Sequence, residues 1–522
     1  MCNFACGMVS LLGGLVLVAV SSFVAFGVVP GIIDGVIESE VVLINETEQF
    51  DRFEEVPFPL TFNVRLFNVS NADVVLNGGV PVVTEVGPYV YKLTQTREIE
   101  EMGEDSITYR RRDQFEFDPE ASYPLTEDDR VTIANVAFHS ILQMAERLFP
   151  GLMFLLNNIL SGVFGEHSGP LMTVRVGDLL FEGVSICKDP GLIGLIVCSQ
   201  IASIGANVRN LEVLDDGSLR FAVLKYKNDT VSEKYVVSRG LKDPRQMGII
   251  ASYNNSAFLT NWVNWMNDSG DVTPSTCNMV NGTDSGVFPP FVDRSSPVFA
   301  LNTDICRSAE LRYQYDSEYE GIPVARFSAN EWFLDNEAGC FCLNTTTGIT
   351  KEDGCLKKGA MELYSCVGAF LILSYPHFLY ADFAYRNGVI GMKPFEDKHR
   401  IFVDLEPNTG TVIRGMKRAQ FNVFMRPVTS ITSTQNLRTT LMPIFWVEEG
   451  MELPEDYVDM LTTRMLNRLR LVDILIPVLI TVCALVAVLG VVILIRVRYA
   501  KRNIAPSKST TSITPTTYTI DN

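Results

Sequence analysis

Cysteine is the residue type whose number and spacing most directly predict chemistry in this chain. Of eleven cysteines, six lie within ninety residues of one another, at Cys277, Cys306, Cys340, Cys342, Cys355 and Cys366. An even, clustered set is typical of a disulfide framework. Zinc binding is the alternative, but no paired Cys-x-x-Cys spacing or neighbouring histidine cluster supports it. The sequence therefore predicts disulfide bonds in a compartment outside the cytosol.

The spacing by itself leaves the pairing open, because six cysteines allow fifteen connectivities. Residues 340–342 read Cys-Phe-Cys. If this segment is extended, its two sulfur atoms point to opposite sides, so they should bond to different partners rather than to each other. A further pair, Cys187 and Cys198, flanks Gly191 and Gly194 and is a candidate for an additional local bridge.

Seven Asn-x-Ser/Thr sequons predict a glycosylated surface. They lie at Asn45, Asn68, Asn228, Asn254, Asn267, Asn281 and Asn344, all inside the long central part of the chain. Cys2 and Cys6 stand apart from the other cysteines, in a short stub beside an apolar stretch. Cysteines next to a membrane are the usual substrates of S-palmitoylation, so both are candidate acylation sites, with plain thiols as the alternative.

Catalytic motifs are missing from the sequence. It contains no nucleophile elbow, no phosphate-binding glycine loop, no His-Glu-x-x-His helix and no calcium-loop pattern. The four histidines, His139, His167, His377 and His399, have no metal-type spacing, and we expect His377 and His399 to be structural. The sequence therefore predicts neither an enzyme nor a cofactor.

Two apolar stretches, one near each end of the chain, predict membrane spans. Residues 474–495 are almost wholly apolar and are followed by Arg496, Arg498, Lys501 and Arg502. An α-helix of this length matches the ~30 Å hydrocarbon core, whereas a buried helix of a soluble protein rarely runs so long without a polar face. Residues 8–29 carry no charge, and no Lys or Arg precedes Arg52. This favours an uncleaved anchor over a signal peptide.

The two spans divide the chain into five predicted segments. These are a cytosolic stub at 1–7, a first span at 8–30, an extracellular or lumenal domain at 31–472, a second span at 473–495 and a disordered cytosolic tail at 496–522. The basic residues after the second span place both termini in the cytosol. With 43 basic and 61 acidic residues the chain has a net charge of −18, which argues against nucleic-acid binding.

Strand-like and helical patterns share the central domain. Residues 60–67 and 80–93 are rich in β-branched and aromatic side chains, with a turn at Asn77, Gly78 and Gly79, and residues 211–214 and 219–226 predict a hairpin across the Asp-Asp-Gly at 215–217. Residues 421–425 and 443–447 are later strand candidates. By contrast, residues 131–164 show helical spacing, interrupted at Pro150 and Gly151.

Motifs along the whole central domain resemble the class B scavenger receptor family, which includes the fatty-acid translocase, the high-density-lipoprotein receptor and the lysosomal integral membrane protein. They are LFNVSNA at 66–72, LNGG at 76–79, EVGPYVY at 85–91, YRRR at 109–112, NGTD at 281–284, FPPF at 288–291, ICRS at 305–308, GIPV at 321–324, CFC at 340–342, PHFLYA at 376–381 and DLEPNTG at 404–410. The motifs occur in family order, which is more specific than any single motif.

The resemblance implies an α+β fold, in which an irregular antiparallel β-barrel body with a lipid-conducting tunnel carries a helical-bundle apex and is flanked by two transmembrane helices. It also implies three disulfide pairs in the disulfide-rich region at 277–366, namely Cys277 with Cys340, Cys306 with Cys366, and Cys342 with Cys355. The bridge between Cys187 and Cys198 is not required by the family pattern.

The family's ligands dock at the apex, which the resemblance places at residues 131–164. Candidate ligand-binding residues there and just beyond are Leu152, Met153, Phe154, Leu155, Phe164, Glu166 and His167. Burial of the short apolar segment 152–156 in the core is the alternative. The fatty-acid translocase carries lysines near the positions of Gly165 and His167, and here Glu166 lies between them. We therefore expect a preference for neutral lipids, sterols or a protein partner over anionic particles.

The sequence thus predicts a membrane glycoprotein and receptor that binds lipids or lipoprotein-like particles and transfers fatty acids or sterols through an apolar tunnel toward the membrane. The alternative is a lysosomal or endosomal trafficking or adhesion receptor that binds a protein partner at its apex. The tail has no dileucine or Tyr-x-x-apolar sorting motif, which favours the plasma membrane over the lysosome. His167, with an unperturbed pKa of ~6.5, is expected to strengthen binding below about pH 6, unless it is merely an exposed loop residue.

Overall fold

The computed structural model describes residues 4–206, 208–266, 270–337 and 339–504. It divides into two compact units, Met1–Val36 with Asp456–Asn522, and Ile37–Glu455. We refer to them as the helical unit and the body unit.

Two long apolar helices make up the helical unit, one near each end of the chain, and each is long and apolar enough to span a membrane. One is continuous from Phe4 to Val41 and the other from Glu455 to Arg502. In the first, α1 (Phe4–Phe23) passes through a π-helical turn, Val24–Val28, into α2 (Val29–Val41). Pro30 lacks the amide hydrogen that would continue the helical ladder, and the wider turn comes directly before it.

The second helix runs through α13 (Glu455–Leu461), a π-helical turn at Thr462–Leu466 and α14 (Asn467–Ile504). The predicted disordered tail at 496–522 is therefore wrong for residues 496–504, which continue the helix. The rest of that tail, 505–522, lies outside the described residues. Small residues bring α1 and α14 together, since a Cβ atom added to Gly14 would lie 2.4 Å from the Ala487 amide nitrogen.

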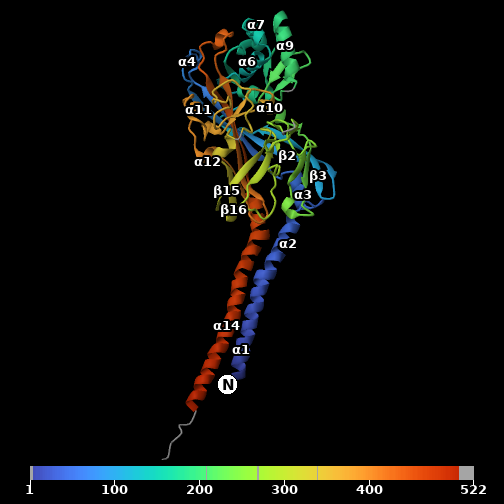
Figure 1. Ribbon diagram of the computed structural model, residues 1–522, viewed down its shortest axis with the longest axis vertical. Coiled ribbons are helices and arrows are strands. Elements are labelled where there is room, and N and C mark those ends of the chain that lie inside the picture. Colours follow the sequence, from blue (N-terminus) through green and yellow to red (C-terminus); the bar gives the residue numbers. More distant parts are fainter. Residues whose placement is uncertain (1–3, 207, 267–269, 338, 505–522) are drawn as a thin grey trace, which may run out of the picture. The chain divides into compact units, whose positions relative to one another are not determined.

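An antiparallel sheet of fourteen strands forms the centre of the body unit, as expected (Figure 1). Its main path is β11 (Ile250–Tyr253), β10 (Tyr235–Ser238), β3 (Ser106–Phe117), β2 (Val83–Met102), β1 (Leu60–Val69), β21 (Thr440–Glu452), β20 (Val412–Met425), β19 (Ile401–Leu405), β16 (Ile322–Ala329), β15 (Arg307–Tyr319) and β14 (Val298–Asn302). Beside this path lie β9 (Thr230–Val231), β17 (Met361–Glu362) and β18 (Ile372–Ser374).

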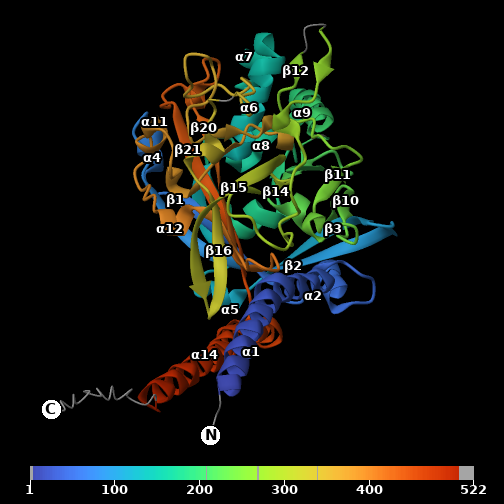
Figure 2. The same ribbon diagram turned by 60° about the horizontal axis from the view of Figure 1, so that its bottom comes forward.

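The expected strands at 60–67, 80–93, 421–425 and 443–447 belong to this sheet. β1 pairs with β2 and with β21, and the labels of Figure 2 locate these strands. Phe421 of β20 lies opposite Phe445 of β21. The ladder of named strands is an open path rather than a closed barrel over the described residues. Its two outer strands are nevertheless connected, because the Gly282 carbonyl accepts from Ile250 N–H of β11 (2.9 Å) and Thr283 pairs with Ala300 of β14.

Three small sheets accompany the large one. β4 (Arg130–Ala134) pairs with β5 (Leu171–Arg175), β12 (Trp265–Met266) pairs with β13 (Val272–Thr273), and β8 (Leu219–Phe221) lies between β6 (Val184–Ile186) and β7 (Leu211–Val213). The expected hairpin is present in β7 and β8, which turn through Gly217 at a φ of +81°.

Most helices of the body unit are short. Those outside the region of the predicted apex are α3 (Glu48–Glu54), α4 (Ala72–Leu76), α5 (Pro119–Ser122), α10 (Tyr364–Val367), α11 (Phe383–Arg386) and α12 (Glu396–His399). The helices in the region of the predicted apex gather at one end of the body unit, whereas α3 lies toward the opposite end (Figure 1). We call this group, α6 (Val136–Leu148), α7 (Met153–Leu156), α8 (Leu160–Phe164) and α9 (Gly191–Gly205), the helical cluster.

The predicted helical segment 131–164 is wrong at its start. Residues 130–134 form strand β4, and α6 begins only after Asn135, whose side-chain oxygen accepts a hydrogen bond from Phe138 N–H (3.1 Å). An N-cap of this kind fixes the first turn of a helix. The interruption at Pro150 is present as a 3-10 turn, Pro150–Leu152, and the segment beyond it is divided into α7 and α8.

Candidate functional site

A cavity of about 200 Å³ lies inside the body unit, bordered by strands β1, β15, β19, β20 and β21. We call it the body cavity. Most of its lining is apolar, including Leu60, Phe62, Leu224, Phe288, Leu301, Phe333, Phe402, Val447 and Met451. Alternation along β1 explains the first two, because Leu60 and Phe62 are buried while Thr61 between them is exposed.

Charged side chains border the same cavity and form what we call the charged belt. Lys227 Nζ lies 2.6 Å from Asp304 Oδ2, and Lys417 Nζ lies 2.5 Å from Glu449 Oε1. Arg111 also lines the cavity and is paired with Asp113 at 3.1 Å. These partners come from β3, β20, β21, the 3-10 turn Lys225–Lys227 and the turn after β14. Only the folded sheet brings them together.

Glu449 and Asp304, the acidic partners of the two lysines, are ionised at neutral pH. Burial raises the pKa of Glu449, but the positive charges of Lys417, Lys227 and Arg111 outweigh burial and bring its pKa down to about 2. Burial also raises the pKa of Asp304, but the charge and hydrogen bond of Lys227, together with the charge of Arg111, bring its pKa below the usual value. Buried and paired charges in an otherwise apolar cavity can act as hydrogen-bond partners for a polar group there.

His377 and His399 are 6% and 5% exposed and lie in one buried polar cluster. His377 Nε2 lies 2.6 Å from Glu85 Oε2, while its Nδ1 accepts from Lys393 N–H. The ring of His399 stacks on that of His377 at 4.6 Å, and its Nδ1 accepts from Phe395 N–H. Among the described residues, no group of three or more His, Cys, Asp or Glu could hold a metal ion.

Acid should destabilise the body unit through His139. This side chain is 4% exposed, and its Nε2 lies 3.0 Å from the Pro170 carbonyl oxygen. Burial lowers its pKa to about 4, below the unfolded value of ~6.5. The neutral form therefore stabilises the fold above pH 6.5, and this contribution is lost as the pH falls toward 4, by about 2 kcal/mol at pH 5.

The measurement is the thermal unfolding midpoint of the protein at pH 7.5 and pH 5.0. We expect the midpoint to fall on acidification, and to fall less in His139→Gln, which does not titrate. An equal fall in both proteins would contradict the contribution assigned to His139.

The candidate ligand-binding residues of the helical cluster differ in exposure. Phe154 and Leu155 are 63% and 42% exposed, and Glu166 is exposed as well. The expectation of a surface role is wrong for Met153 and Phe164, which are 5% and 3% exposed and belong to the main core. The ring centroids of Phe164 and Phe138 are 5.4 Å apart, so the Phe164 side chain packs in the core rather than on the surface. Nothing is described for the side chain of Leu152.

The remaining two candidates of this region lie next to each other. His167 Nε2 is 3.6 Å from Glu166 Oε1, and the His167 carbonyl accepts from the Asn135 side chain at 2.7 Å. The expected effects of Glu166 on ligand charge and of His167 on pH dependence stay predictions.

Helix α9 was missed by the sequence reasoning. Its residues include no charged side chain, and Leu192, Ile193, Leu195 and Ile196 are 87%, 63%, 55% and 67% exposed. An uncharged run of this length is the signal that could have predicted it, but the helix is apolar all round and shows no amphipathic period. A disulfide between Cys187 and Cys198 ties its middle to the residue after β6.

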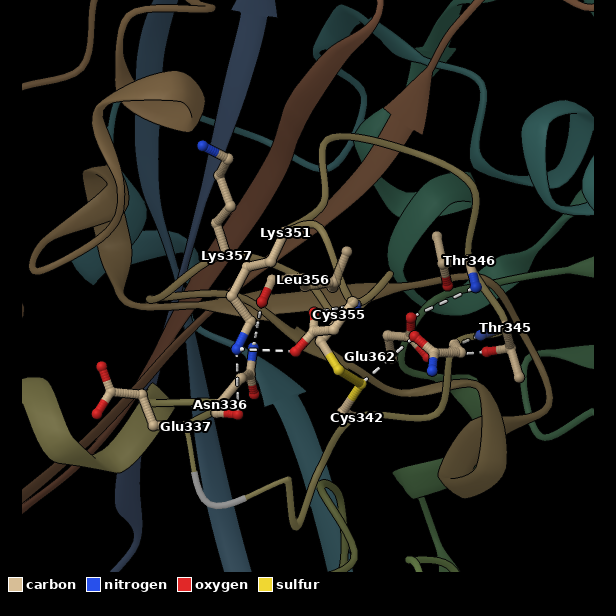
Figure 3. The surroundings of a disulfide bond; sticks show 12 residues. Asn336, Glu337, Cys342, Thr345, Thr346, Lys351, Cys355, Leu356, Lys357 and Glu362 are labelled. Atoms are coloured by element: carbon tan, nitrogen blue, oxygen red, sulfur yellow. Dashed lines mark hydrogen bonds and ion pairs between the residues drawn. A yellow bond between two sulfur atoms is a disulfide. The ribbon is translucent and has the colours of Figure 1, made fainter.

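Three disulfides lie in the region 277–366. They join Cys277 to Cys340, Cys306 to Cys366, and Cys342 to Cys355, the pairs that the family resemblance implies. Figure 3 shows the surroundings of the third, where Asn336 donates to the Leu356 carbonyl (3.0 Å). Asn336 also donates to the Ala360 carbonyl (2.9 Å). Nearby, the buried carboxylate of Glu362 accepts from Thr345 Oγ1 at 2.9 Å. Polar contacts thus order this loop around its crosslink.

The sequons differ in how freely a glycan could be attached. Asn45, Asn254 and Asn344 are exposed, whereas Asn68, Asn228 and Asn281 are half-buried. Asn267 lies outside the described residues. Of the two acylation candidates, Cys2 is likewise outside them, and the sulfur of Cys6 is engaged in a disulfide. A sulfur held in a disulfide cannot form a thioester, so the expectation of an acylation site is wrong for Cys6, whereas acylation of Cys2 stays a prediction.

The amino-acid sequence was compared with protein-family models and with known proteins, and both comparisons found similar sequences. Residues 11–494 match the model of the CD36 family. The chain is 35% identical to sensory neuron membrane protein 2 of Drosophila melanogaster, over 85% of this chain and 89% of that protein. It is 34% identical to sensory neuron membrane protein 2 of Aedes aegypti, over 90% and 96%, and 31% identical to sensory neuron membrane protein 1 of Mamestra brassicae, over 93% and 90%.

Proposed function

Because the chain belongs to the CD36 family of scavenger-receptor-like membrane proteins, we propose that it binds long-chain lipids in its body cavity and passes them toward the membrane. CD36-family proteins are receptors or transporters, and the chain is not an enzyme. The family resemblance also implies lipids and lipoprotein-like particles as ligands. Transfer needs an apolar passage and a docking surface rather than a catalytic group.

The observation that carries this proposal is the combination of an apolar lining with the charged belt. The cavity of about 200 Å³ is far larger than the roughly 10–15 Å³ that a single water needs. Its apolar walls could bind a hydrocarbon chain, because transfer of apolar surface from water to an apolar environment is favourable. The same cavity offers Lys227 and Lys417 to a polar head group.

The charged belt favours an amphiphilic ligand over a plain hydrocarbon. Each ammonium group carries three protons. The described residues give Lys227 Nζ one hydrogen-bond partner, Asp304, and Lys417 Nζ one, Glu449. The remaining protons could be donated to an oxygen atom of a lipid head group. A hydrocarbon without such an oxygen would displace water from these charged groups without replacing the lost hydrogen bonds, which is unfavourable.

Filling the body cavity should remove lipid binding. Gly415 borders the cavity, and a Cβ atom added there would meet its nearest neighbour at 3.6 Å, so a side chain can be built without a backbone clash. We expect Gly415→Phe to weaken the binding of a fluorescent long-chain fatty acid by at least about tenfold, because the ring would occupy the site of the chain.

The matched control is Thr61→Phe, which adds the same ring at an exposed position of β1. Both variants would be compared as full-length protein in lipid nanodiscs, with empty nanodiscs as the blank. Equal binding by the wild type and Gly415→Phe would exclude the body cavity as the lipid site.

We propose in addition that the body unit lies outside the cytosol, at the plasma membrane, with both termini cytosolic. Glycosidase treatment should then shift the protein by several glycans, and changing the exposed Asn45, Asn254 and Asn344 to Gln should remove much of that shift. A tag after Asn522 should be protected from protease added to intact cells. Cleavage of that tag would contradict this topology.

The exposed side chains Phe154 and Leu155, together with the outward face of α9, support a docking role for the helical cluster. We propose that lipid-bearing particles are captured there, with neutral particles preferred because Glu166 is exposed at this end.

A further inference from the structure

A second cavity, of about 300 Å³, lies within the helical cluster and is separate in its lining from the body cavity. We call it the cluster cavity. Helices α6, α7 and α9 supply most of its walls, and residues 368–370 close one side. Its volume is at the lower end of the range typical of ligand-binding pockets.

The lining of the cluster cavity differs chemically from that of the body cavity. It contains no charged side chain among the described residues, and its polar side chains are Ser140 and Gln200. The hydroxyl oxygen of Ser140 is buried and has no hydrogen-bond partner in the described part of the chain. A buried hydroxyl without a partner is costly unless a bound molecule or water satisfies it.

Helix α9 lies between this cavity and the solvent. Ile193 and Ile196 line the cavity and are also 63% and 67% exposed, so the cavity opens at this helix. Gln200, one turn further along, is exposed and also lines the cavity. The disulfide between Cys187 and Cys198 holds the middle of α9 in place over it.

From these observations we infer that the cluster cavity binds a neutral hydrophobic molecule with one hydroxyl group, such as a long-chain alcohol or a sterol. The apolar walls hold the hydrocarbon part, and the ligand hydroxyl exchanges a hydrogen bond with Ser140 Oγ. A carboxylate would be disfavoured, because none of the described residues that line the cavity is a cation that could replace its hydration. The inference shares lipid binding with the proposed function but assigns it to a different cavity.

The test uses the full chain kept in solution by an amphipathic polymer, with empty polymer as the blank. Three radiolabelled probes are compared: hexadecan-1-ol, cholesterol and hexadecanoic acid. We expect saturable binding of at least one of the two neutral probes that Ala145→Phe removes, since Ala145 lines the cavity and a ring there would fill it. Which neutral probe binds identifies an alcohol or a sterol as the source of the hydroxyl.

The hydroxyl contact is tested by Ser140→Ala, which should weaken binding of the neutral probe by about fivefold, the size of one hydrogen bond. Ser140→Thr keeps the hydroxyl and should restore binding. Neither change at Ser140 should alter binding of hexadecanoic acid. Equal weakening of all three probes would indicate a merely structural effect and would overturn the role of Ser140.

Gly415→Phe separates this inference from the proposed function, because that variant blocks only the body cavity. Neutral-probe binding that persists in Gly415→Phe and is lost in Ala145→Phe supports the cluster cavity, whether or not the body cavity binds lipid. Loss in Gly415→Phe with retention in Ala145→Phe, or no saturable binding of either neutral probe, would overturn the inference.

Discussion

Asp284→Asn is expected to prevent most of the protein from reaching a stable fold. Asp284 and Arg97 are buried together, with side chains 2% and 1% exposed, and Arg97 Nε lies 2.8 Å from Asp284 Oδ2. Tyr109 Oη donates to the same carboxylate oxygen at 2.8 Å, and Gly286 N–H donates to the other at 3.0 Å.

The size of the effect follows from the charge that is left behind. Burial raises the pKa of Asp284, but the charges of Arg97 and Arg111 and the hydrogen bonds from Gly286 and Tyr109 together lower it to about 2, so the pair is ionised at neutral pH. Asparagine keeps the shape of the side chain and removes its charge, which leaves the Arg97 guanidinium buried without a counterion. Breaking a buried pair in this way costs about 3–5 kcal/mol, a large part of a typical stability of about 5–15 kcal/mol.

Two further variants test whether the loss of stability comes from the unpaired buried charge. Asp316→Asn removes one member of an exposed pair with Arg294, and exposed pairs contribute about 1 kcal/mol or less, so its unfolding midpoint should stay near that of the wild type. Arg97→Met combined with Asp284→Leu removes both charges and should recover part of the loss. An Asp284→Asn protein as stable as Asp316→Asn would contradict the account.

Cys306→Ser is expected to reduce delivery of the protein to the cell surface. The crosslink between Cys306 and Cys366 spans sixty residues, and closing a loop of that length contributes about 4 kcal/mol on the chain-entropy model. Asp304, which pairs with Lys227 in the charged belt, lies two residues before Cys306. Loss of the crosslink should therefore also loosen one wall of the body cavity.

Surface labelling of intact cells measures this effect. The matched variant is Cys187→Ser, which opens the shorter loop of eleven residues, worth about 3 kcal/mol on the same model, and should cost less. Cys366→Ser should reproduce Cys306→Ser, and the double variant should show how much of the loss is due to the free thiol. Normal surface levels in both single variants and in the double variant would count against the assigned role of the crosslink.

Local sequence predicted the elements whose side-chain pattern is regular and whose ends carry a turn signal. Strands β1 and β2 are of this kind, since each is rich in β-branched and aromatic side chains and the Asn-Gly-Gly turn signal lies between them. The start of α6 was misassigned because Val131 and Ala134 fit a helical period as well as a buried strand. The first residue of α6 is set by the N-cap at Asn135. This contact cannot be recognised from the spacing of apolar residues alone.

The site was harder to predict because its parts are far apart in the chain. Lys227 and Asp304 are separated by 77 positions, and in the sequence each resembles an ordinary solvated surface charge. Their role in the body cavity arises only from the pairing of distant strands. The cluster cavity was missed for another reason, since α9 is uniformly apolar without an amphipathic period, and its glycines resemble those of a loop.

The most direct test of the central claim is to find where a bound lipid lies. A photoreactive long-chain fatty acid, irradiated while bound to the full-length protein, should label peptides that line the body cavity, such as those of 300–311, 412–421 and 447–451. Excess unlabelled fatty acid and the Gly415→Phe substitution should both suppress this labelling. Labelling confined to the two membrane-spanning helices, and unchanged in Gly415→Phe, would contradict lipid binding in the body cavity.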